Sequence, residues 1–419
     1  MLLIFPESRI IPSMQPKERV LTFEEARSAV EQHAATIPRP AVETVQLDAT
    51  LSRILAEPII ADRDVPPFPR AMRDGYAVRA ADLATLPTRL KILGEIKAGG
   101  DPSAFHLQPG QAASIMTGAP APAGADAVVM VEHTTSNGDI VEIARSIVSG
   151  DNIVPTGAEA HRGDSLLAPG THVDEAVIAV AASVGKVRLR VYARPRIAIL
   201  STGDELVSLN ETPGPNHIRN SNSHSLAAQV RKAGGEPAIL PIAPDEKTRL
   251  RALIEDGLQN DLLLLSGGVS VGRYDFVEQV LEDLGAEFFF TGALIQPGRP
   301  VVFGRIGKTY FFGLPGNPVS TMVTFELFTR PILEALSGAT PRPLRFLHAK
   351  LKTPITRKPG LRRFLPATLS GAFENAEVEL TAWQGSGDLA SAARANCFIV
   401  IAPDREHHAA GEWIPILQR

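Results

Sequence analysis

The most constraining feature of the sequence is the stretch 195–338, where short apolar segments alternate with segments of helical periodicity. Strands are predicted over 196–200, 237–242, 261–265, 287–290, 300–303 and 309–312, and helices over 223–233, 248–257, 276–284 and 319–336. Helices of this length between short buried strands are typical of a doubly wound α/β domain. We therefore expect a parallel sheet with helices on both faces.

The segments around this stretch predict β-rich structure. Residues 64–163 have short apolar runs between Gly/Pro clusters, as expected of an inserted β module. Residues 18–63 and 164–194 predict a mixed α+β linking domain, discontinuous in sequence, with a helix that begins at a capping box of Thr22 and Glu25. Residues 341–419 predict a small C-terminal β-barrel-like domain. The predicted fold is a multidomain α/β plus β protein.

Composition excludes several classes of protein. Lys and Arg number 42 against 46 Asp and Glu, so the net charge of −4 does not suit a chain built to coat nucleic acid or an acidic membrane. The single cysteine, Cys397, excludes a disulfide framework and a cysteine-ligated metal site. Apolar runs are far shorter than the roughly 20 residues of a spanning helix, and no targeting segment is evident. We expect a cytoplasmic protein.

Three predicted strands run into loops of small and acidic residues, over 201–205, 266–272 and 313–320. In an open parallel sheet, ligands bind outside the carboxyl ends of the strands, where such loops converge. Glycines let the backbone approach a phosphate, and N–H groups at the start of the following helix favour an anion. The three loops together predict an anionic ligand.

Acidic residues accompany these loops. Asp204, Glu205 and Asp275 lie in or beside them, and Asp245 precedes another predicted helix. Carboxylates beside a phosphate repel it unless a divalent cation lies between them, and Mg²⁺ is the usual cation. The alternative is structural, because Asp275 and Asp245 could each cap the helix that follows.

One further motif gives an alternative function. Residues 268–272 match the Gly-x-Ser-x-Gly pattern of a hydrolase nucleophile elbow, with Ser270 as the nucleophile. However, Ser266 and Gly267 separate the strand from this turn, and the helical pattern begins only at Phe276. Both features argue against a serine hydrolase, which is the weakest of three hypotheses for the function.

Taken together, the motifs resemble the molybdopterin molybdenumtransferase (molybdenum insertase) family, which includes the insertase domain of gephyrin. The resemblance runs from about Lys17 to Arg419. Its most specific pieces are Asp74-Gly75-Tyr76-Ala77, Met116-Thr117-Gly118-Ala119, Ser201-Thr202-Gly203-Asp204-Glu205-Leu206, Ser221-Asn222-Ser223, Ser266-Gly267-Gly268-Val269-Ser270 and Gly313-Leu314-Pro315-Gly316-Asn317-Pro318. The family implies a four-domain homodimer that inserts molybdate into adenylylated molybdopterin with Mg²⁺ and releases AMP.

The resemblance also implies roles for individual residues. Asp74, Thr117, Glu205, Asp245 and Asp275 match catalytic acidic or hydroxyl positions, with Asp275 and Glu205 as Mg²⁺ ligands. Arg299, Pro300, Ser320 and Ser386 match positions that hold molybdate or the dithiolene end of the substrate. The remaining substrate-binding candidates are Ser201, Thr202, Gly203, Asp204, Ser221, Asn222, Ser266, Gly267, Gly268, Ser270, Pro315, Gly316, Asn317, Pro318 and Arg362. A molybdopterin adenylyltransferase, and apo-molybdoenzymes or their chaperones, are the partners the resemblance implies.

Four positions depart from the family pattern. Arg73 precedes Asp74, Gln296 stands where a lysine is usual, Glu159 follows Ala158 in place of a Glu-Asp pair, and Leu361 takes the place of an arginine. The leading hypothesis is an active molybdenum insertase. The alternative, favoured by Gln296 and Arg73, is a non-catalytic or weakened paralogue that carries molybdopterin.

Overall fold

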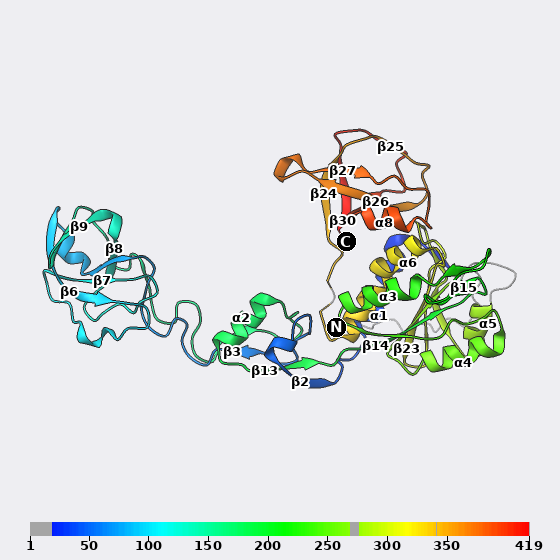
Figure 1. Cartoon of the computed structure of the whole chain (residues 1–419), viewed down its shortest axis with the longest axis horizontal. Helices are drawn as coiled ribbons and strands as arrows, with labels where there is room; N and C mark the ends of the chain where they lie inside the picture. The colour runs from blue at the N-terminus through cyan, green and yellow to red at the C-terminus, as the bar shows by residue number, and fades with distance from the viewer. Residues whose placement is uncertain (1–18, 269–275, 341, 419) are drawn as a thin grey trace, which may run out of the picture. The chain divides into compact units, whose positions relative to one another are not determined.

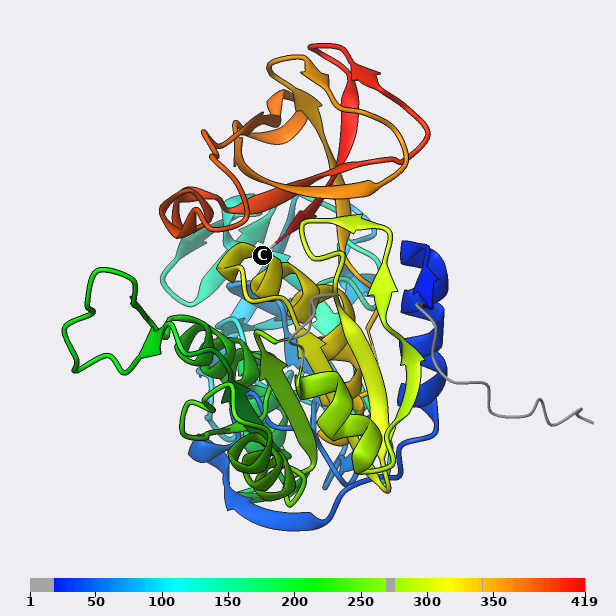
Figure 2. The same ribbon diagram turned by 90° about the vertical axis from the view of Figure 1, so that its right-hand side faces the viewer.

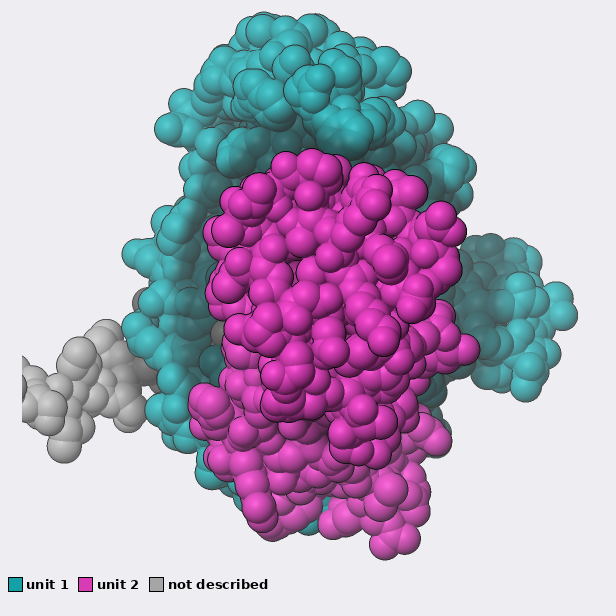
Figure 3. All heavy atoms as spheres, turned by 90° about the vertical axis from the view of Figure 1, so that its left-hand side faces the viewer, with its two compact units in different colours: residues 1–43, 52–54, 191–419 teal, residues 44–51, 55–190 magenta. Residues whose placement is uncertain are grey.

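The structure is a computed structural model that describes residues 19–268, 276–340 and 342–418. The chain divides into two compact units, which Figure 3 colours separately. Unit 1 contains residues 1–43, 52–54 and 191–419, and unit 2 contains residues 44–51 and 55–190. Among the described residues, no helix combines the length and apolarity needed to cross a membrane.

Unit 1 is built on a six-stranded α/β sheet. Its strands lie in the order β17 (Glu236–Ile239), β14 (Arg196–Ser201), β18 (Leu262–Ser266), β23 (Thr309–Leu314), β22 (Val302–Ile306) and β19 (Glu287–Phe290). The first four strands are parallel, whereas β22 and β19 are antiparallel to their neighbours. Gly307 and Lys308 alone join β22 to β23, and so short a connection can only make a hairpin. The sheet is therefore mixed, although alternation of strands and helices predicted a parallel one.

Helices cover both faces of this sheet, as the alternating side chains of β14 show. Ile197 and Ile199 pack in one core with α1 (Phe23–Ala35), α3 (Asn222–Lys232), α6 (Pro318–Thr324) and α7 (Arg330–Leu336). Ala198 and Leu200 pack in a second core with α4 (Lys247–Gly257) and α5 (Phe276–Asp283). Figures 1 and 2 show the two helical layers. The doubly wound α/β fold predicted from the sequence is confirmed.

Local signals also explain how two helices of unit 1 begin and bend. The Thr22 hydroxyl accepts from the Glu25 N–H and the Glu25 carboxylate accepts from the Thr22 N–H, which is the predicted capping box of α1. The helix predicted over 319–336 contains a π-helical turn, Phe325–Thr329, between α6 and α7. Pro331 has no N–H to donate to the preceding turn, so the regular ladder is interrupted there.

The C-terminal part of unit 1 is a closed five-stranded barrel. The strands are β26 (Arg362–Ser370), β27 (Glu377–Leu380), β24 (Phe346–Leu351), β30 (Trp413–Gln418) and β28 (Cys397–Ile401), and pairing of β26 with β28 closes the ring. The strand β21 (Ile295–Gln296) pairs with the start of β26, and α8 (Leu389–Arg394) precedes β28. Smaller pairs in unit 1 are β1 (Val20–Leu21) with β20 (Gly292–Ala293), β15 (Leu206–Val207) with β16 (Ile218–Arg219), and β25 (Ile355–Thr356) with β29 (His407–His408). The predicted β-barrel is confirmed.

Unit 2 contains a second six-stranded sheet. Its order is β8 (Ala127–Met130), β5 (Gly75–Val78), β7 (Gln111–Ile115), β6 (Thr88–Ile96), β10 (Ile140–Ile143) and β9 (Thr134–Asn137). Unit 2 also contains two two-stranded sheets and a helix. The sheets are β4 (Arg70–Ala71) with β11 (Ile153–Val154) and β3 (Ile59–Ile60) with β12 (Ser165–Leu167), and the helix is α2 (Glu175–Ser183). The chain passes from one unit to the other within β2 (Val42–Gln46) and within β13 (Arg188–Tyr192), and also on either side of residues 52–54.

Candidate functional site

Three parallel strands of unit 1 end level with one another. The register pairs Ser201, the last residue of β14, with Ser266, the last of β18, and pairs Ser266 with Leu314, the last of β23. The chain runs from β14 through α3 to β17, and then through α4 to β18 on the other side of β14. This reversal places the topological switch point between β14 and β18, which is where doubly wound sheets bind ligands.

A buried network of polar side chains lies at the end of β14. The Ser201 hydroxyl donates to Asn220 Oδ1 (3.2 Å) and is 2.8 Å from the Ser223 hydroxyl. Asn220 Nδ2 donates to the Ser223 hydroxyl, and Asn220 Oδ1 also accepts from the Ser223 N–H at the start of α3. The network fixes the loop that leads into α3 against the strand. Ser201 was predicted from the sequence and Asn220 was missed, although a polar residue just before a helix is a capping signal.

The side chain of Asn222 connects two neighbouring strand ends. Its Nδ2 donates to the Ser266 hydroxyl (2.9 Å) and to the Gly316 carbonyl (2.8 Å). A carbonyl can only accept, so this contact fixes the orientation of the amide group. Asn222 is 9% exposed, and its Oδ1 is a buried acceptor without a hydrogen-bond partner among the described residues. The structure thus brings three predicted residues together and leaves one acceptor available.

The glycines after β18 allow two loops to pack closely. Gly267 and Gly268 have φ angles of 89° and 63°. A Cβ at Gly267 would lie 2.6 Å from the Thr202 carbonyl oxygen, and one at Gly268 would lie 2.7 Å from the Thr202 hydroxyl. That hydroxyl is buried without a hydrogen-bond partner in the described part of the chain. The residues that follow, including Ser270, lie outside the described residues.

Three carboxylates gather beside the loop that follows β14. The Asp245 N–H donates to Asp204 Oδ1 (3.0 Å), and the Glu205 carboxylate folds back against Gly203. The pKa of Asp245 is raised above its ordinary value by partial burial and by repulsion from Asp204 and Glu205. Helix α4 has Glu246 at its N-cap position, without a side-chain capping bond, so the expectation that Asp245 caps this helix was wrong.

The described residues do not by themselves form a metal site. Within 19–268, 276–340 and 342–418, no group of three or more His, Cys, Asp and Glu side chains is arranged to hold a metal ion. Asp275, the first choice as Mg²⁺ ligand, lies outside these ranges. Burial, and after it repulsion from Asp204 and Glu205, raise the pKa of Asp245, and a cation beside Glu205 would reduce that repulsion.

This charge cluster makes a pH-dependent stability prediction. Because the folded-state pKa of Asp245 is raised, ionising it costs stability, and the cost appears as the pH rises above the ordinary value of 3.8. We expect Asp245→Asn to raise the melting temperature near neutral pH by about 1–2 °C, and the gain to shrink as the pH falls toward about 4. Thermal unfolding at several pH values measures this. Asp256→Asn on α4 is the control, and an equal gain in both variants would contradict the prediction.

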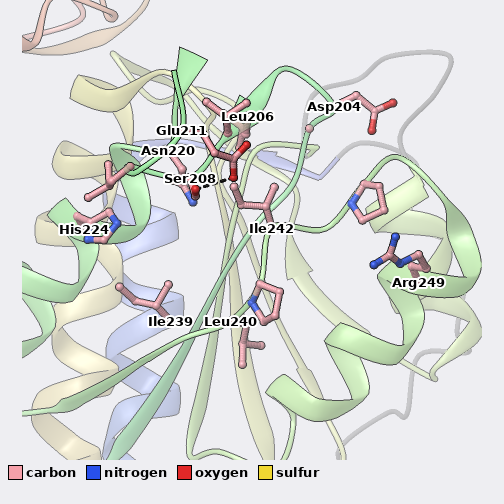
Figure 4. A pocket seen from close by; sticks show the side chains of 15 residues that line it. Asp204, Leu206, Ser208, Glu211, Asn220, His224, Ile239, Leu240, Ile242 and Arg249 are labelled. Carbon is pink, nitrogen blue, oxygen red and sulfur yellow. Dashed lines mark hydrogen bonds between the residues drawn. The ribbon is translucent and has the colours of Figure 1, made fainter. Parts of the chain in front are cut away.

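A cavity of about 560 Å³ opens beside the ends of β14 and β17. Figure 4 shows Glu211 hydrogen-bonded to Ser208 at this cavity, with His224 of α3 and Arg249 of α4 also lining it. Apolar contacts come from Ile239, Leu240 and Ile242. Of the predicted residues, Gly203 and Asp204 line it. The others were missed because they come from helices and loops whose meeting depends on strand order.

A second cavity, of about 590 Å³, is lined by residues that follow β21, β23 and β27. It brings together five predicted residues, Arg299, Pro300, Asn317, Ser320 and Ser386. The Val319 N–H donates to the Ser386 carbonyl (3.0 Å), which ties the start of α6 to the 386 loop. Pro315 supports the same turn, because its carbonyl accepts from the Thr321 hydroxyl.

In unit 2, the structure brings Asp74 and Thr117 together. The Thr117 N–H donates to Asp74 Oδ1 (2.6 Å), and hydrogen bonds from Thr117 hold the pKa of the exposed Asp74 carboxyl below its ordinary value. Asp74 is therefore ionised and pinned to the loop after β7. Glu159, one of the departures, pairs with Arg70 (3.0 Å) in the same unit, and Arg73 is exposed.

The residue after Asp74 must be glycine for steric reasons. A Cβ at Gly75 would overlap the Val129 carbonyl oxygen on the neighbouring strand β8. We expect Gly75→Ala to lower the free energy of unfolding by about 2 kcal/mol or more, since backbone atoms must move. Urea unfolding followed by circular dichroism measures the loss. Gly387→Ala, which adds a Cβ in open space, is the control and should unfold like the natural chain.

Sequence comparison identifies relatives over nearly the whole chain. A molybdopterin molybdenumtransferase from Bacillus subtilis is 36% identical over 385 residues, which are 90% of this chain and 89% of that protein. One from Haemophilus influenzae is 34% identical and spans 95% of this chain and 98% of its own. The chain belongs to the molybdopterin molybdenumtransferase family. This confirms the family predicted from the sequence motifs.

Family models and solved structures agree with this assignment. Residues 21–185 match the MoeA N-terminal region (domain I and II), 198–335 match a probable molybdopterin binding domain, and 348–418 match the MoeA C-terminal region (domain IV). A crystal structure of a molybdopterin biosynthesis MoeA protein from Pyrococcus horikoshii is 28% identical, with a TM-score of 0.77 over 96% of this chain and 100% of that one. Another structure of a MoeA protein from a Pyrococcus is 33% identical, with a TM-score of 0.70.

Two departures from the family pattern meet in unit 1. Gln296 Oε1 accepts from Arg363 Nε (2.7 Å), and Arg363 is 6% exposed on the neighbouring strand. A lysine at position 296 would place a second cation beside this buried guanidinium. Arg362 pairs with Glu24 (2.5 Å) and lies over the Phe23 ring, so Leu361, not Arg362, lines the second cavity.

Proposed function

We propose that this molybdopterin molybdenumtransferase inserts molybdate into adenylylated molybdopterin, with release of AMP, at the level ends of β14, β18 and β23. The observation that carries the proposal is the pair of hydrogen bonds from Asn222 to Ser266 and Gly316 at the switch point of the sheet, which we call the Asn222 strap. The strap joins the start of α3 to the ends of β18 and β23, beside glycines whose loops let backbone N–H groups contact a phosphate. The reaction itself is inferred from the membership of this chain in the molybdopterin molybdenumtransferase family.

The residues proposed to bind substrate form two groups, one at the strand ends and one in the second cavity. The pterin and its phosphates are bound by Ser201, Thr202, Gly203, Asp204, Ser221, Asn222, Ser266, Gly267, Gly268, Ser270, Pro315, Gly316, Asn317 and Pro318. Two buried polar atoms that have no hydrogen-bond partner among the described residues, Asn222 Oδ1 and the Thr202 hydroxyl oxygen, support this assignment. Molybdate is held in the second cavity by Arg299, Pro300, Ser320 and Ser386. Arg362 supports that cavity through its contact with α1, beside Leu361.

The acidic residues bind the cation and assist the departure of AMP. Glu205 and Asp275 would hold Mg²⁺, with Asp245 close by, and the ion would reduce the repulsion that, after burial, raises the pKa of Asp245. Bound there, the ion would neutralise phosphate charge and polarise the bond to AMP. Asp74 and Thr117 remain proposed catalytic residues on the family pattern, and the ionised state of Asp74 suits it to accept a proton or a hydrogen bond.

Several broader features of the family complete the proposal. We propose a homodimer of four-domain chains, divided at 18–63 with 164–194, 64–163, 195–338 and 341–419, in which the discontinuous domain serves dimerisation. A molybdopterin adenylyltransferase would supply the substrate, and apo-molybdoenzymes or their chaperones would take the product. The cytoplasmic location stays a prediction from the sequence.

AMP release from adenylylated molybdopterin, measured with Mg²⁺ and with or without molybdate, tests the reaction. The proposal predicts molybdate-dependent AMP release that is lost in Asp275→Ala. Tight binding of the substrate without AMP release would replace it with the carrier hypothesis. Absence of binding would contradict both.

A further inference from the structure

A third cavity lies at the opposite edge of the α/β sheet from the candidate site. It measures about 550 Å³ and is lined where β14, β18 and β23 begin, whereas the candidate site lies where they end. Its walls are the segment 36–41 after α1, residues 193–195, residues 259–261, the turn between β22 and β23, and Leu336 of α7. All of these belong to unit 1.

Four cationic side chains line this cavity, and one of them, Arg305, is paired with Glu287. Arg39, Arg194, Arg305 and Lys308 line it, against a single carboxylate, Asp261, whose Oδ2 accepts from the Arg196 N–H (2.7 Å). In the part of the chain that the structure describes, neither Arg194 nor Lys308 has a carboxylate within ion-pair distance. Among the described residues, the charges of Arg194 and Lys308 at this cavity are therefore not neutralised by a carboxylate.

Two of the cations are held in place by the protein. The Arg39 guanidinium donates to the Gly338 carbonyl and lies 5.7 Å from the centre of the Tyr192 ring. Arg305 pairs with Glu287 (2.7 Å) across β22 and β19, and Tyr310, beside it on β23, is 6% exposed. Arg39 and Arg305 therefore add positive potential to the cavity, and Arg194 and Lys308 are the cations left to contact a ligand.

Part of the remaining wall is apolar, and Thr36, Gln259, Asn260 and Thr309 add polar groups to it. Ile37, Pro38, Pro40, Pro195 and Leu336 contribute hydrocarbon surface. A volume of this size, apolar walls and a few convergent charged groups are the usual features of a small-molecule site. The ligand must then carry negative charge on an apolar body.

We propose that this cavity, at the amino-terminal edge of the sheet, binds a small organic anion, with a carboxylate, sulfonate or phosphate held by Arg194 and Lys308 and an apolar part held by the proline and Leu336 walls. The site is separate from the insertase site and does not depend on the proposed function. Strands β14, β18 and β23 connect the two edges.

Titration with 8-anilinonaphthalene-1-sulfonate, an aromatic organic anion that fluoresces when bound, tests the proposal. The natural chain should bind the probe with one component that the double variant Arg194→Glu/Lys308→Glu loses, by about tenfold or more in affinity. Arg231→Glu/Lys358→Glu makes the same charge change at exposed positions elsewhere in unit 1 and should retain that component. Melting temperatures of both variants should match the natural chain.

Two outcomes would overturn the proposal. Equal probe binding by both double variants would show that Arg194 and Lys308 hold no anion. A change in oligomeric state of Arg194→Glu/Lys308→Glu, measured by light scattering, would show that these cations face a second copy of the chain instead.

Discussion

Replacing Asn222 by alanine is expected to lower kcat/KM for molybdate-dependent AMP release by about 10- to 100-fold. The substitution removes the hydrogen bonds to Ser266 and Gly316, and it leaves the buried Ser266 hydroxyl without the donor that Asn222 supplies. An unsatisfied buried group costs about 1–3 kcal/mol, and a loop freed from its strap no longer holds the substrate in position. Steady-state kinetics across substrate concentrations measures the effect.

Ser225→Ala is the matched control for Asn222→Ala. The Ser225 hydroxyl donates to the Asn222 carbonyl (3.0 Å) in the same helix. Removal of this hydroxyl perturbs α3 but keeps the hydrogen bonds from Asn222 to Ser266 and Gly316. The control should keep kcat/KM within about twofold of the natural chain. Near-natural kinetics in Asn222→Ala, with the fold intact, would show that the strap does not position substrate.

Replacing Glu205 by glutamine is the second change with a large expected effect. Glu205 contributes to the negative charge that raises the pKa of Asp245, and glutamine keeps its size while removing that charge. If Glu205 helps to hold Mg²⁺, activity at limiting Mg²⁺ should fall by about 10- to 100-fold, and the Mg²⁺ concentration for half activity should rise. Activity measured over a Mg²⁺ titration reports both quantities.

Glu211→Gln controls for the loss of one carboxylate near the site. Glu211 lines the cavity beside β14 and β17, and within the described part of the chain its carboxylate accepts a hydrogen bond only from Ser208 of the same loop (2.6 Å). The Mg²⁺ dependence of the Glu211→Gln variant should match that of the natural chain. The same shift in both variants would mean that the loss of general negative charge, and not a cation held by Glu205, explains the effect.

The sequence allowed the fold to be predicted where local signals agree with one another. The strand Leu262–Ser266 has four leucines before its final serine and is followed by glycines, and Thr22 and Glu25 mark the start of α1, so these elements were located within a few residues. Strands were predicted close to β22 and β19, but their antiparallel direction was missed because the pairing of strands depends on contacts between distant segments. The two-residue connection at Gly307 and Lys308 was the signal available for this hairpin.

The candidate site was predictable only in part. The glycine and serine loops at the strand ends follow from the rule that ligands bind there, and Ser201, Ser266 and Gly316 do come together. Asn220, His224 and Arg249 were missed, because helix directions and strand order bring them to the cavity. The Gln296–Arg363 hydrogen bond likewise requires the pairing of β21 with β26, which no local pattern indicates.

Amide hydrogen exchange of the full-length protein, with and without adenylylated molybdopterin, tests most directly whether the substrate binds at the ends of β14, β18 and β23. The account predicts slower exchange at 201–205, 266–268 and 315–317, and unchanged exchange at 36–41 and 305–310 at the other edge of the sheet. Protection confined to other segments, with the strand ends unchanged, would contradict it.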